Sequence, residues 1–229
     1  DDHLTFQTAH CTATKTTGGE SELQVLVRAI CEAALLAGTP LPPAPWAPVL
    51  PPVLARSDVP AGAVGLLDDP DRQRVAPLQW APGDGHLLIA GSPGAGVTST
   101  IHTLATHALT HDDPSTTALH VYVLDGRGDQ RLTELTAHTG CVAVVRLHER
   151  ERLMRLLHRL RGLTRAGMAQ RSEIRVVLFI DGLDAVRRAL DEVATATEFD
   201  ALEEVLANGE AAGITIVAGV EHAAAVPAG

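Results

Sequence analysis

A glycine-rich segment near the middle of the chain has the residue types and spacing of a phosphate-binding loop. It reads Gly91-Ser92-Pro93-Gly94-Ala95-Gly96-Val97-Thr98-Ser99 and lies between an apolar run and a helical pattern. In that context glycines let backbone N–H groups face phosphate oxygens, and the N-terminus of the following helix favours an anion. The segment predicts a phosphate loop of the G-x-x-x-x-G-K-[ST] type. The alternative is a strand-to-helix turn that binds no ligand.

One position of this loop departs from the pattern. Val97 stands where the lysine is expected, and the only lysine of the chain is Lys15. The missing ammonium group would bridge the β- and γ-phosphates of a nucleotide, whereas the hydroxyl of Thr98 would still be available to Mg²⁺. The pattern therefore predicts that ATP and Mg²⁺ bind weakly or not at all.

A second motif is an apolar run that ends in a carboxylate, Val176-Val177-Leu178-Phe179-Ile180-Asp181. In a Walker B strand such a residue lies beside Mg²⁺, so Asp181 and Thr98 are the predicted metal ligands. Active ATPases of the additional-strand class place an acidic residue next, but here Gly182 follows. Near its end the last apolar run reads Val217-Ala218-Gly219, without a polar side chain to sense the γ-phosphate. These three departures predict a site that does not hydrolyse ATP, and we assign no catalytic residue.

Five apolar runs and the helical patterns between them predict the fold class. Amphipathic helices between runs that are apolar on both faces are typical of a parallel sheet covered on both sides. We therefore expect an α/β core of the nucleotide-binding type. The runs are His86–Ala90, Leu119–Leu124, Val142–Leu147, Ile174–Ile180 and Ile214–Val220.

The N-terminal part of the chain has a different organisation. Ser21 and Gln24 have capping-box spacing before a helical pattern, and Gly38 and Pro40 would end that helix. We expect residues 1–20 to be a peripheral tail, 21–60 a helix with a proline-rich connector, and 61–229 the phosphate-loop domain. The early end after the fifth run suggests that this domain is truncated at its C-terminus.

Composition and charge exclude several classes of protein. Hydrophobic residues make up 45% and charged residues 20% of the 229 residues, which excludes a wholly disordered chain. Three cysteines without short spacing exclude a disulfide scaffold, and no apolar run reaches the roughly 18 residues of a membrane helix. A net charge of −10 argues against a dedicated nucleic-acid binder.

Nine arginines between residues 146 and 175 form a basic cluster in this acidic chain. Arg152, Arg155 and Arg159 would share one face of a helix beside an apolar face. The favoured interpretation is a solvated amphipathic helix. A subunit-interface arginine that reaches a neighbour's nucleotide and a DNA-facing patch are the alternatives.

The order of these motifs resembles the FtsK/SpoIIIE-type ATPase modules, and most of all the tandem modules of EccC, the coupling ATPase of type VII secretion. The resemblance covers about residues 20–225. Besides the phosphate loop, the segments that carry it are Asp68–Gln73, Val121–Asp125, Thr139–Val142, Ile180–Val186 and Glu210–Ile214. Leu4–Ala9 resembles the closing strand of a preceding module, so the chain looks like a slice of a longer tandem protein.

This resemblance implies a RecA-like three-layer sandwich and a degenerate second or third ATPase module that acts in substrate recognition or regulation. It also implies partners: other modules of the same protein, secreted helical-hairpin proteins and a homo-hexamer of the full-length protein. The place would be the cytoplasmic side of a secretion complex anchored in the inner membrane. Two alternatives remain: an active NTPase whose missing lysine is replaced by an arginine, and a DNA translocase module of the FtsK kind.

Overall fold

The computed structural model describes residues 21–40, 46–111, 118–169, 174–193 and 196–222. Contacts divide the chain into two units, Asp1–Ala47 with Pro70–Gln73, and Pro48–Asp69 with Arg74–Gly229. The expected tail at 1–20, with its strand at Leu4–Ala9, lies outside the described residues. The boundary expected at residue 60 stays a prediction.

Helix α1 (Glu22–Leu36) confirms the helix predicted in the N-terminal part. The capping box is formed: Ser21 N donates to Gln24 Oε1 at 2.8 Å, and Gln24 N donates to Ser21 Oγ at 3.3 Å. Leu26 and Ile30 on its apolar stripe are 56% and 58% exposed, so local capping rather than core burial accounts for this helix. Across the described ranges, no helix combines the length and the apolar character that crossing a membrane requires.

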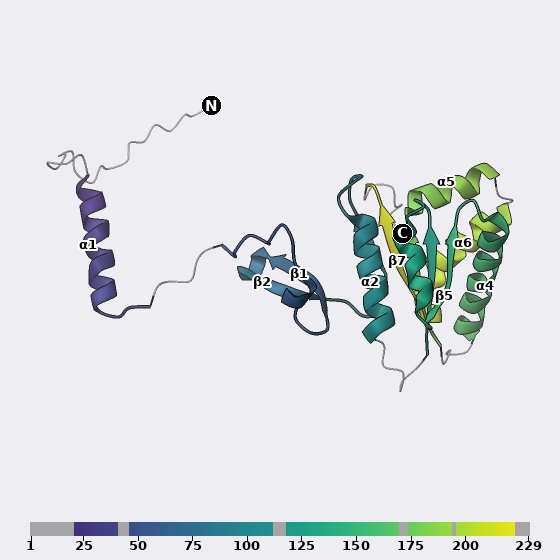
Figure 1. Cartoon of the computed structure of the whole chain (residues 1–229), viewed down its shortest axis with the longest axis horizontal. Helices are drawn as coiled ribbons and strands as arrows, with labels where there is room; N and C mark the ends of the chain where they lie inside the picture. Colours follow the sequence, from purple (N-terminus) through teal and green to yellow (C-terminus); the bar gives the residue numbers. More distant parts are fainter. Residues whose placement is uncertain (1–20, 41–45, 112–117, 170–173, 194–195, 223–229) are drawn as a thin grey trace, which may run out of the picture. The chain divides into compact units, whose positions relative to one another are not determined.

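A five-stranded sheet forms the centre of the second unit (Figure 1). Its order is β3-β7-β6-β4-β5, and every pair of neighbours is parallel. The predicted parallel sheet is therefore confirmed. The strands are β3 (Leu87–Ala90), β4 (Leu119–Asp125), β5 (Cys141–Arg146), β6 (Arg175–Asp181) and β7 (Ile214–Val220).

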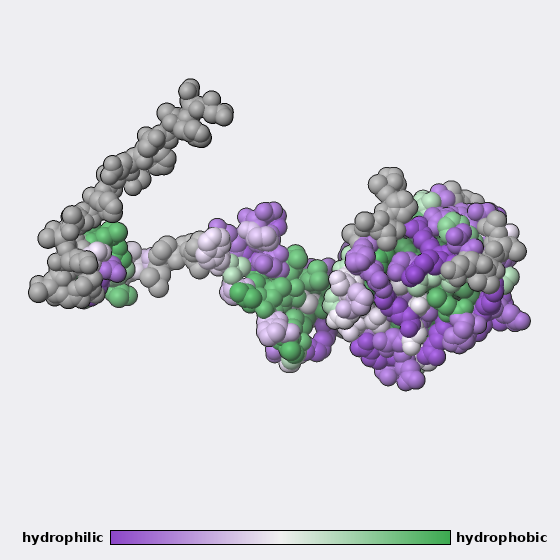
Figure 2. Space-filling view, turned by 90° about the horizontal axis from the view of Figure 1, so that it is seen from above, coloured by the Kyte–Doolittle hydropathy of each residue, from purple (hydrophilic) through white to green (hydrophobic). Residues whose placement is uncertain are grey.

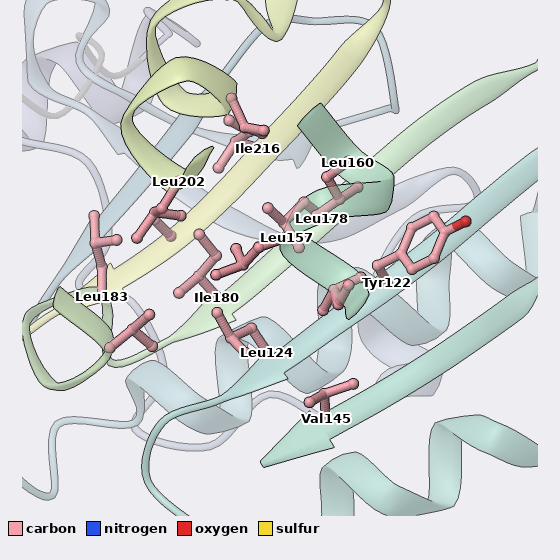
Figure 3. Packing of buried hydrophobic residues seen from close by; sticks show 14 of the residues in the cluster. Tyr122, Leu124, Val145, Leu157, Leu160, Leu178, Ile180, Leu183, Leu202 and Ile216 are labelled. Carbon is pink, nitrogen blue, oxygen red and sulfur yellow. The ribbon is translucent and has the colours of Figure 1, made fainter. Parts of the chain in front are cut away.

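Helices cover both faces of this sheet, as the predicted three-layer sandwich requires. Helix α2 (Val97–His111) and the short α3 (Gln130–Glu134) lie on one face, and α4 (Arg150–Ala169), α5 (Leu183–Val193) and α6 (Ala196–Asn208) lie on the other. Successive strand residues alternate between the two layers: Val121 and Val123 pack toward α2, whereas Tyr122 and Leu124 pack toward α4. Figure 3 shows this second layer, in which the leucines of α4 meet the side chains of β4 and β6.

An antiparallel hairpin, which the sequence did not predict, precedes the sheet. It consists of β1 (Ala63–Asp69) and β2 (Arg74–Gln79). Figure 2 shows apolar residues gathered over this part of the chain, and Leu67 and Leu78 are 47% and 40% exposed. Trp80, directly after β2, packs edge-on against Phe179 of β6 with ring centroids 6.0 Å apart. Short 3-10 helices lie at Arg56–Asp58, Pro70–Arg72, Leu135–Ala137 and Glu210–Ala212.

Candidate functional site: a phosphate loop bordered by two arginines

The predicted loop has the required strand–loop–helix context. It leaves β3 at Ala90 and enters α2 at Val97. Gly94 and Gly96 have φ of +85° and +94°, a left-handed conformation that favours glycine. A cavity of about 280 Å³ opens at this loop. Its lining includes every residue from Gly91 to Ser99 except Ala95, together with Arg127 and Arg131.

Thr98 and Asp181, predicted to act together, are brought together by the fold. Thr98 Oγ1 donates a hydrogen bond of 2.9 Å to Asp181 Oδ2. Asp181 ends β6 with 0% exposure, and its second oxygen, Oδ1, has no hydrogen-bond partner. A hydroxyl and a carboxylate are oxygen ligands of the kind that Mg²⁺ takes, so these two residues fit the metal in chemical type.

Burial controls the charge state of this carboxyl group. Desolvation raises the pKa of Asp181 above its ordinary value, while the Thr98 hydrogen bond and the Arg127 charge oppose the rise. The charges of Asp125 and Asp129 add to the rise. A carboxylate held in this way favours a cation close to Oδ1.

Val97 lines the cavity, yet its side chain is largely buried in the core beneath the loop. It is 9% exposed and packs with Ile101 in the α2 layer. A Cβ added at Gly219 would lie 2.6 Å from Val97 Cγ1, and one added at Gly91 would lie 2.9 Å from Val97 Cγ2. Two of the three departures noted in the sequence, Val97 and Gly219, are therefore in direct contact.

The loop after β4 completes the site, and the sequence analysis did not assign it a role. Asp125 Oδ1 accepts hydrogen bonds from the backbone N–H groups of Arg127, Gly128 and Asp129 at 3.1, 2.6 and 3.3 Å. Gly126 N donates to the carbonyl oxygen of Asp181 at 2.8 Å. The loop is therefore fixed against the end of β6, because β4 and β6 are neighbours with Asp125 opposite Asp181.

Arg127 projects from this loop toward three carboxylates. Its Nη1 donates to Glu221 Oε1 at 3.1 Å, its Nε lies 3.8 Å from Asp181 Oδ1, and its Nη2 lies 3.9 Å from Asp184 Oδ1. The side chain is 28% exposed and lines the cavity. A guanidinium thus stands where the phosphate loop and the Walker B strand meet.

Arg131 borders the cavity on the side of the loop's end. Its Nη1 donates to Ser99 Oγ at 3.1 Å, and its Nη2 donates to Asp129 Oδ2 at 2.7 Å. Both arginines follow a strand whose end shares one sheet edge with Asp181. The signal in the sequence was Gly-Arg-Gly-Asp directly after a buried strand, which contains Arg127 and lies just before Arg131.

Gly182, the third departure, makes space for Arg127. Its φ is +80°, and a Cβ there would lie 3.2 Å from Arg127 Cγ and 3.3 Å from Arg127 Nε. A side chain at this position would require the Arg127 side chain to shift.

The arginines of α4 have partners within the chain. Arg159 Nε donates to the hydroxyl of Tyr122 at 2.8 Å, Arg165 pairs with Glu204 through two bonds of 2.6 and 2.7 Å, and Arg152 pairs with Glu149. These contacts favour the solvated amphipathic helix over a DNA-facing patch. Within the part of the chain that the structure describes, no three His, Cys, Asp or Glu side chains are placed to hold a metal.

Known proteins resemble this chain in sequence and in fold. No protein-family model matches the chain. The ESX secretion system protein EccC of Geobacillus thermodenitrificans is 33% identical over 113 residues, which are 46% of this chain and 7% of that protein. A solved structure of EssC ATPases 2 and 3 from Geobacillus thermodenitrificans aligns with a TM-score of 0.63 and 21% identity over 79% of this chain and 37% of that one.

Two further structures have the same fold. The cytoplasmic domain of EssC aligns with a TM-score of 0.56 and 21% identity over 72% of this chain and 32% of that one. The cytoplasmic domain of the type VII secretion ATPase EccC of Thermomonospora curvata aligns with a TM-score of 0.58 and 22% identity over 82% and 26%. The chain therefore spans a small part of each relative. The resemblance to an EccC-like ATPase module and the α/β RecA-like fold are confirmed.

Proposed function

We propose that this chain is a nucleotide-binding module of a type VII secretion motor, which binds ATP or ADP weakly and does not hydrolyse ATP. One observation carries the proposal. The cavity keeps its backbone cradle and the Thr98–Asp181 hydrogen bond, whereas Val97, Gly182 and Gly219 supply none of the groups that hydrolysis needs. Weak binding without turnover suits a module that regulates its neighbours or recognises substrate.

The context of this proposal comes from the relatives. Their names describe an ESX secretion system protein, a structure of ATPases 2 and 3 of EssC, and a type VII secretion ATPase. The proposed partners are other ATPase modules of the same protein, secreted helical-hairpin proteins and further copies in a hexamer of the full-length protein. The proposed place is the cytoplasmic side of a complex anchored in the inner membrane.

For magnesium, as for the nucleotide, the proposal is weak binding or none. Thr98 and Asp181 would hold the ion, which would neutralise phosphate charge when bound. Their oxygens are of the right type, and the hydrogen bond between them keeps the two side chains at one place. The loop residues Gly91 to Ser99 would contribute the phosphate contacts through the Thr98 and Ser99 hydroxyls and, except at Pro93, through backbone N–H groups.

A second candidate is an active NTPase in which an arginine replaces the missing lysine. The presence of Arg127 and Arg131 in the lining of the cavity favours this candidate. Turnover distinguishes it from the main proposal, because an arginine that only binds phosphate gives no hydrolysis. The DNA translocase alternative would show DNA binding that weakens steeply with salt.

Titration calorimetry with Mg·ATP and with ADP tests nucleotide binding directly. Losing a charge-assisted contact costs about 1.5–3 kcal/mol, so a micromolar site becomes roughly tenfold to a hundredfold weaker. Gly96→Ala should abolish binding, because its left-handed φ of +94° shapes the loop. Gly213→Ala is the matched control, with φ of +78°, equally open space around its Cβ and a position outside the cavity lining. Submicromolar affinity, or no binding at millimolar nucleotide, would contradict the proposal.

A further inference from the structure

We infer that Arg127 takes the place of a divalent cation beside Asp181, so that the cavity binds nucleoside di- and triphosphates as free polyanions without requiring magnesium. The inference rests on the proposed function, since it presupposes that the cavity binds nucleotide phosphates. It adds the ionic form of the ligand and assigns Arg127 as the residue that determines it.

The first step of the argument is the charge of Asp181. A fully buried carboxylate needs a counter-charge or hydrogen bonds to remain ionised. Oδ2 accepts from Thr98, but Oδ1 has no hydrogen-bond donor. In a metal-dependent phosphate site a divalent cation neutralises this carboxylate. Here the Nε of Arg127 lies 3.8 Å from Oδ1 and supplies a positive charge within the chain.

The second step concerns competition with a metal. A cation bound at Asp181 Oδ1 would stand close to the guanidinium, and like charges at such short range repel strongly in a partly buried site. The metal would therefore have to displace Arg127 from Asp181, Asp184 and Glu221. This competition lowers the affinity for Mg²⁺ relative to a site without the arginine.

The third step concerns the phosphate. A guanidinium carries five N–H donors in a planar fork, which suits phosphate oxygens. The contact of Arg127 with Glu221 is its most exposed one, because the Glu221 side chain is 36% exposed. A phosphate group that enters the cavity can take over this contact while Nε keeps facing Asp181. One side chain then supplies positive charge both at the phosphates, where Val97 offers none, and beside Asp181.

The surrounding backbone holds Arg127 in this position. Asp125 accepts three N–H groups of its loop, and the bond from Gly126 to the Asp181 carbonyl oxygen fixes the loop to β6. Gly182 leaves the space that the stem of Arg127 occupies. Arg131 cannot take the same role, since Asp129 and Ser99 hold it at the other side of the loop.

ADP binding measured by calorimetry in EDTA and in millimolar Mg²⁺ tests the inference. The wild-type chain should give dissociation constants within about threefold of each other under the two conditions. Arg127→Gln should bind about tenfold or more weakly in EDTA and recover in Mg²⁺, because the metal can then reach Asp181. Arg131→Gln should lose the same affinity for ADP in EDTA and in Mg²⁺. Arg165→Gln is the control and should keep its affinity, because it removes only an exposed ion pair with Glu204.

Asp181→Asn provides a second, independent variant. It should strengthen ADP binding, whereas Arg127→Gln should weaken it. Removing the negative charge beside the phosphates should tighten ADP binding both in EDTA and in millimolar Mg²⁺. A site that relies on the metal would instead bind ADP more weakly in Mg²⁺, because it loses a metal ligand. Thermal unfolding shows whether each variant is folded. If Arg127→Gln is not folded, Asp181→Asn tests the inference. Wild-type binding in Mg²⁺ alone would overturn the inference and leave the proposed function standing. Absence of binding in both conditions would overturn both.

Discussion

Val97 occupies the space that Gly219 leaves open: a Cβ at Gly219 would lie 2.6 Å from Val97 Cγ1 and 2.9 Å from Ile101 Cδ1. The residue in the lysine position and the residue at the end of β7 are thus two sides of one packing contact. A lysine at 97 would replace the branched side chain that fills this contact. The loss of the ammonium group and the loss of the side chain on β7 are therefore structurally linked.

Gly219→Ala tests this contact. The added methyl group should lower the free energy of unfolding by about 1–3 kcal/mol through overpacking, or roughly 2–4 °C in Tm per kcal/mol. The double variant Gly219→Ala/Val97→Ala should be less destabilised than the sum of the single changes, with a coupling of about 0.5–3 kcal/mol. Gly162→Ala in α4, with nothing within 4 Å of its Cβ, is the control and should raise stability. Simple additivity in denaturant unfolding would show that the contact is absent.

Val97→Lys should restore a positive charge at the phosphates. We expect nucleotide affinity to increase about tenfold, because a charge-assisted contact contributes about 1.5–3 kcal/mol while repacking opposes part of it. Val97→Met has an unbranched stem without the charge, so it should show the same loss of stability and no gain in affinity. Equal gains for Lys and Met in calorimetry would mean that packing, and not charge, limits binding.

Gly182→Glu should lower stability and give no turnover by itself. The φ of +80° strains any residue with a Cβ by about 1–2 kcal/mol, and the new side chain requires Arg127 to shift. Gly182→Ala shares the backbone strain and serves as the control. Combined with Val97→Lys, the glutamate should not prevent the tighter binding that the lysine brings. Phosphate release by Gly182→Glu alone would show that a single carboxylate was the missing element.

Asp181→Asn should stabilise the chain at neutral pH and not in acid. Burial raises the pKa of Asp181, so the native state favours the protonated carboxyl group. The wild type therefore loses stability as pH rises from about 4, which is the ordinary pKa of an aspartate, to the raised pKa of Asp181 in the folded chain. Asparagine carries no such charge, so the difference in Tm between the two forms should grow over this window and vanish below it. A difference that is constant with pH would assign the effect to packing.

The sheet and the long helices were predictable because their signals are local. The apolar runs before Gly91 and Gly182 and the leucine spacing of α4 define those elements without knowledge of the tertiary structure. The hairpin of β1 and β2 was missed, since Asp68 and Asp69 interrupt its pattern and Gln73 turns the chain with φ of +51°.

The structure brings the phosphate loop and Asp181 together through the Thr98–Asp181 hydrogen bond, whereas their role as nucleotide and metal ligands stays a prediction. Arg127 could not be placed from the sequence. Its position depends on β4 lying next to β6, and on a glycine at 182 that reads in the sequence only as a missing acid. Long-range pairing of strands and the space left by an absent side chain have no signal in a local pattern.

Recovery of bound nucleotide after a single turnover tests the central claim most directly. The purified chain, in excess over γ-labelled ATP and with Mg²⁺ present, is incubated and the label is then separated into ATP and phosphate. Positioned charges and a polarised water supply nearly all catalysis in phosphoryl transfer. Gly182 supplies no carboxylate to polarise that water. We expect the ATP to be recovered intact, with no more phosphate than Asp181→Ala produces. Conversion of ATP to ADP and phosphate by the wild-type chain, lost in Asp181→Ala, would contradict the account and identify an active ATPase.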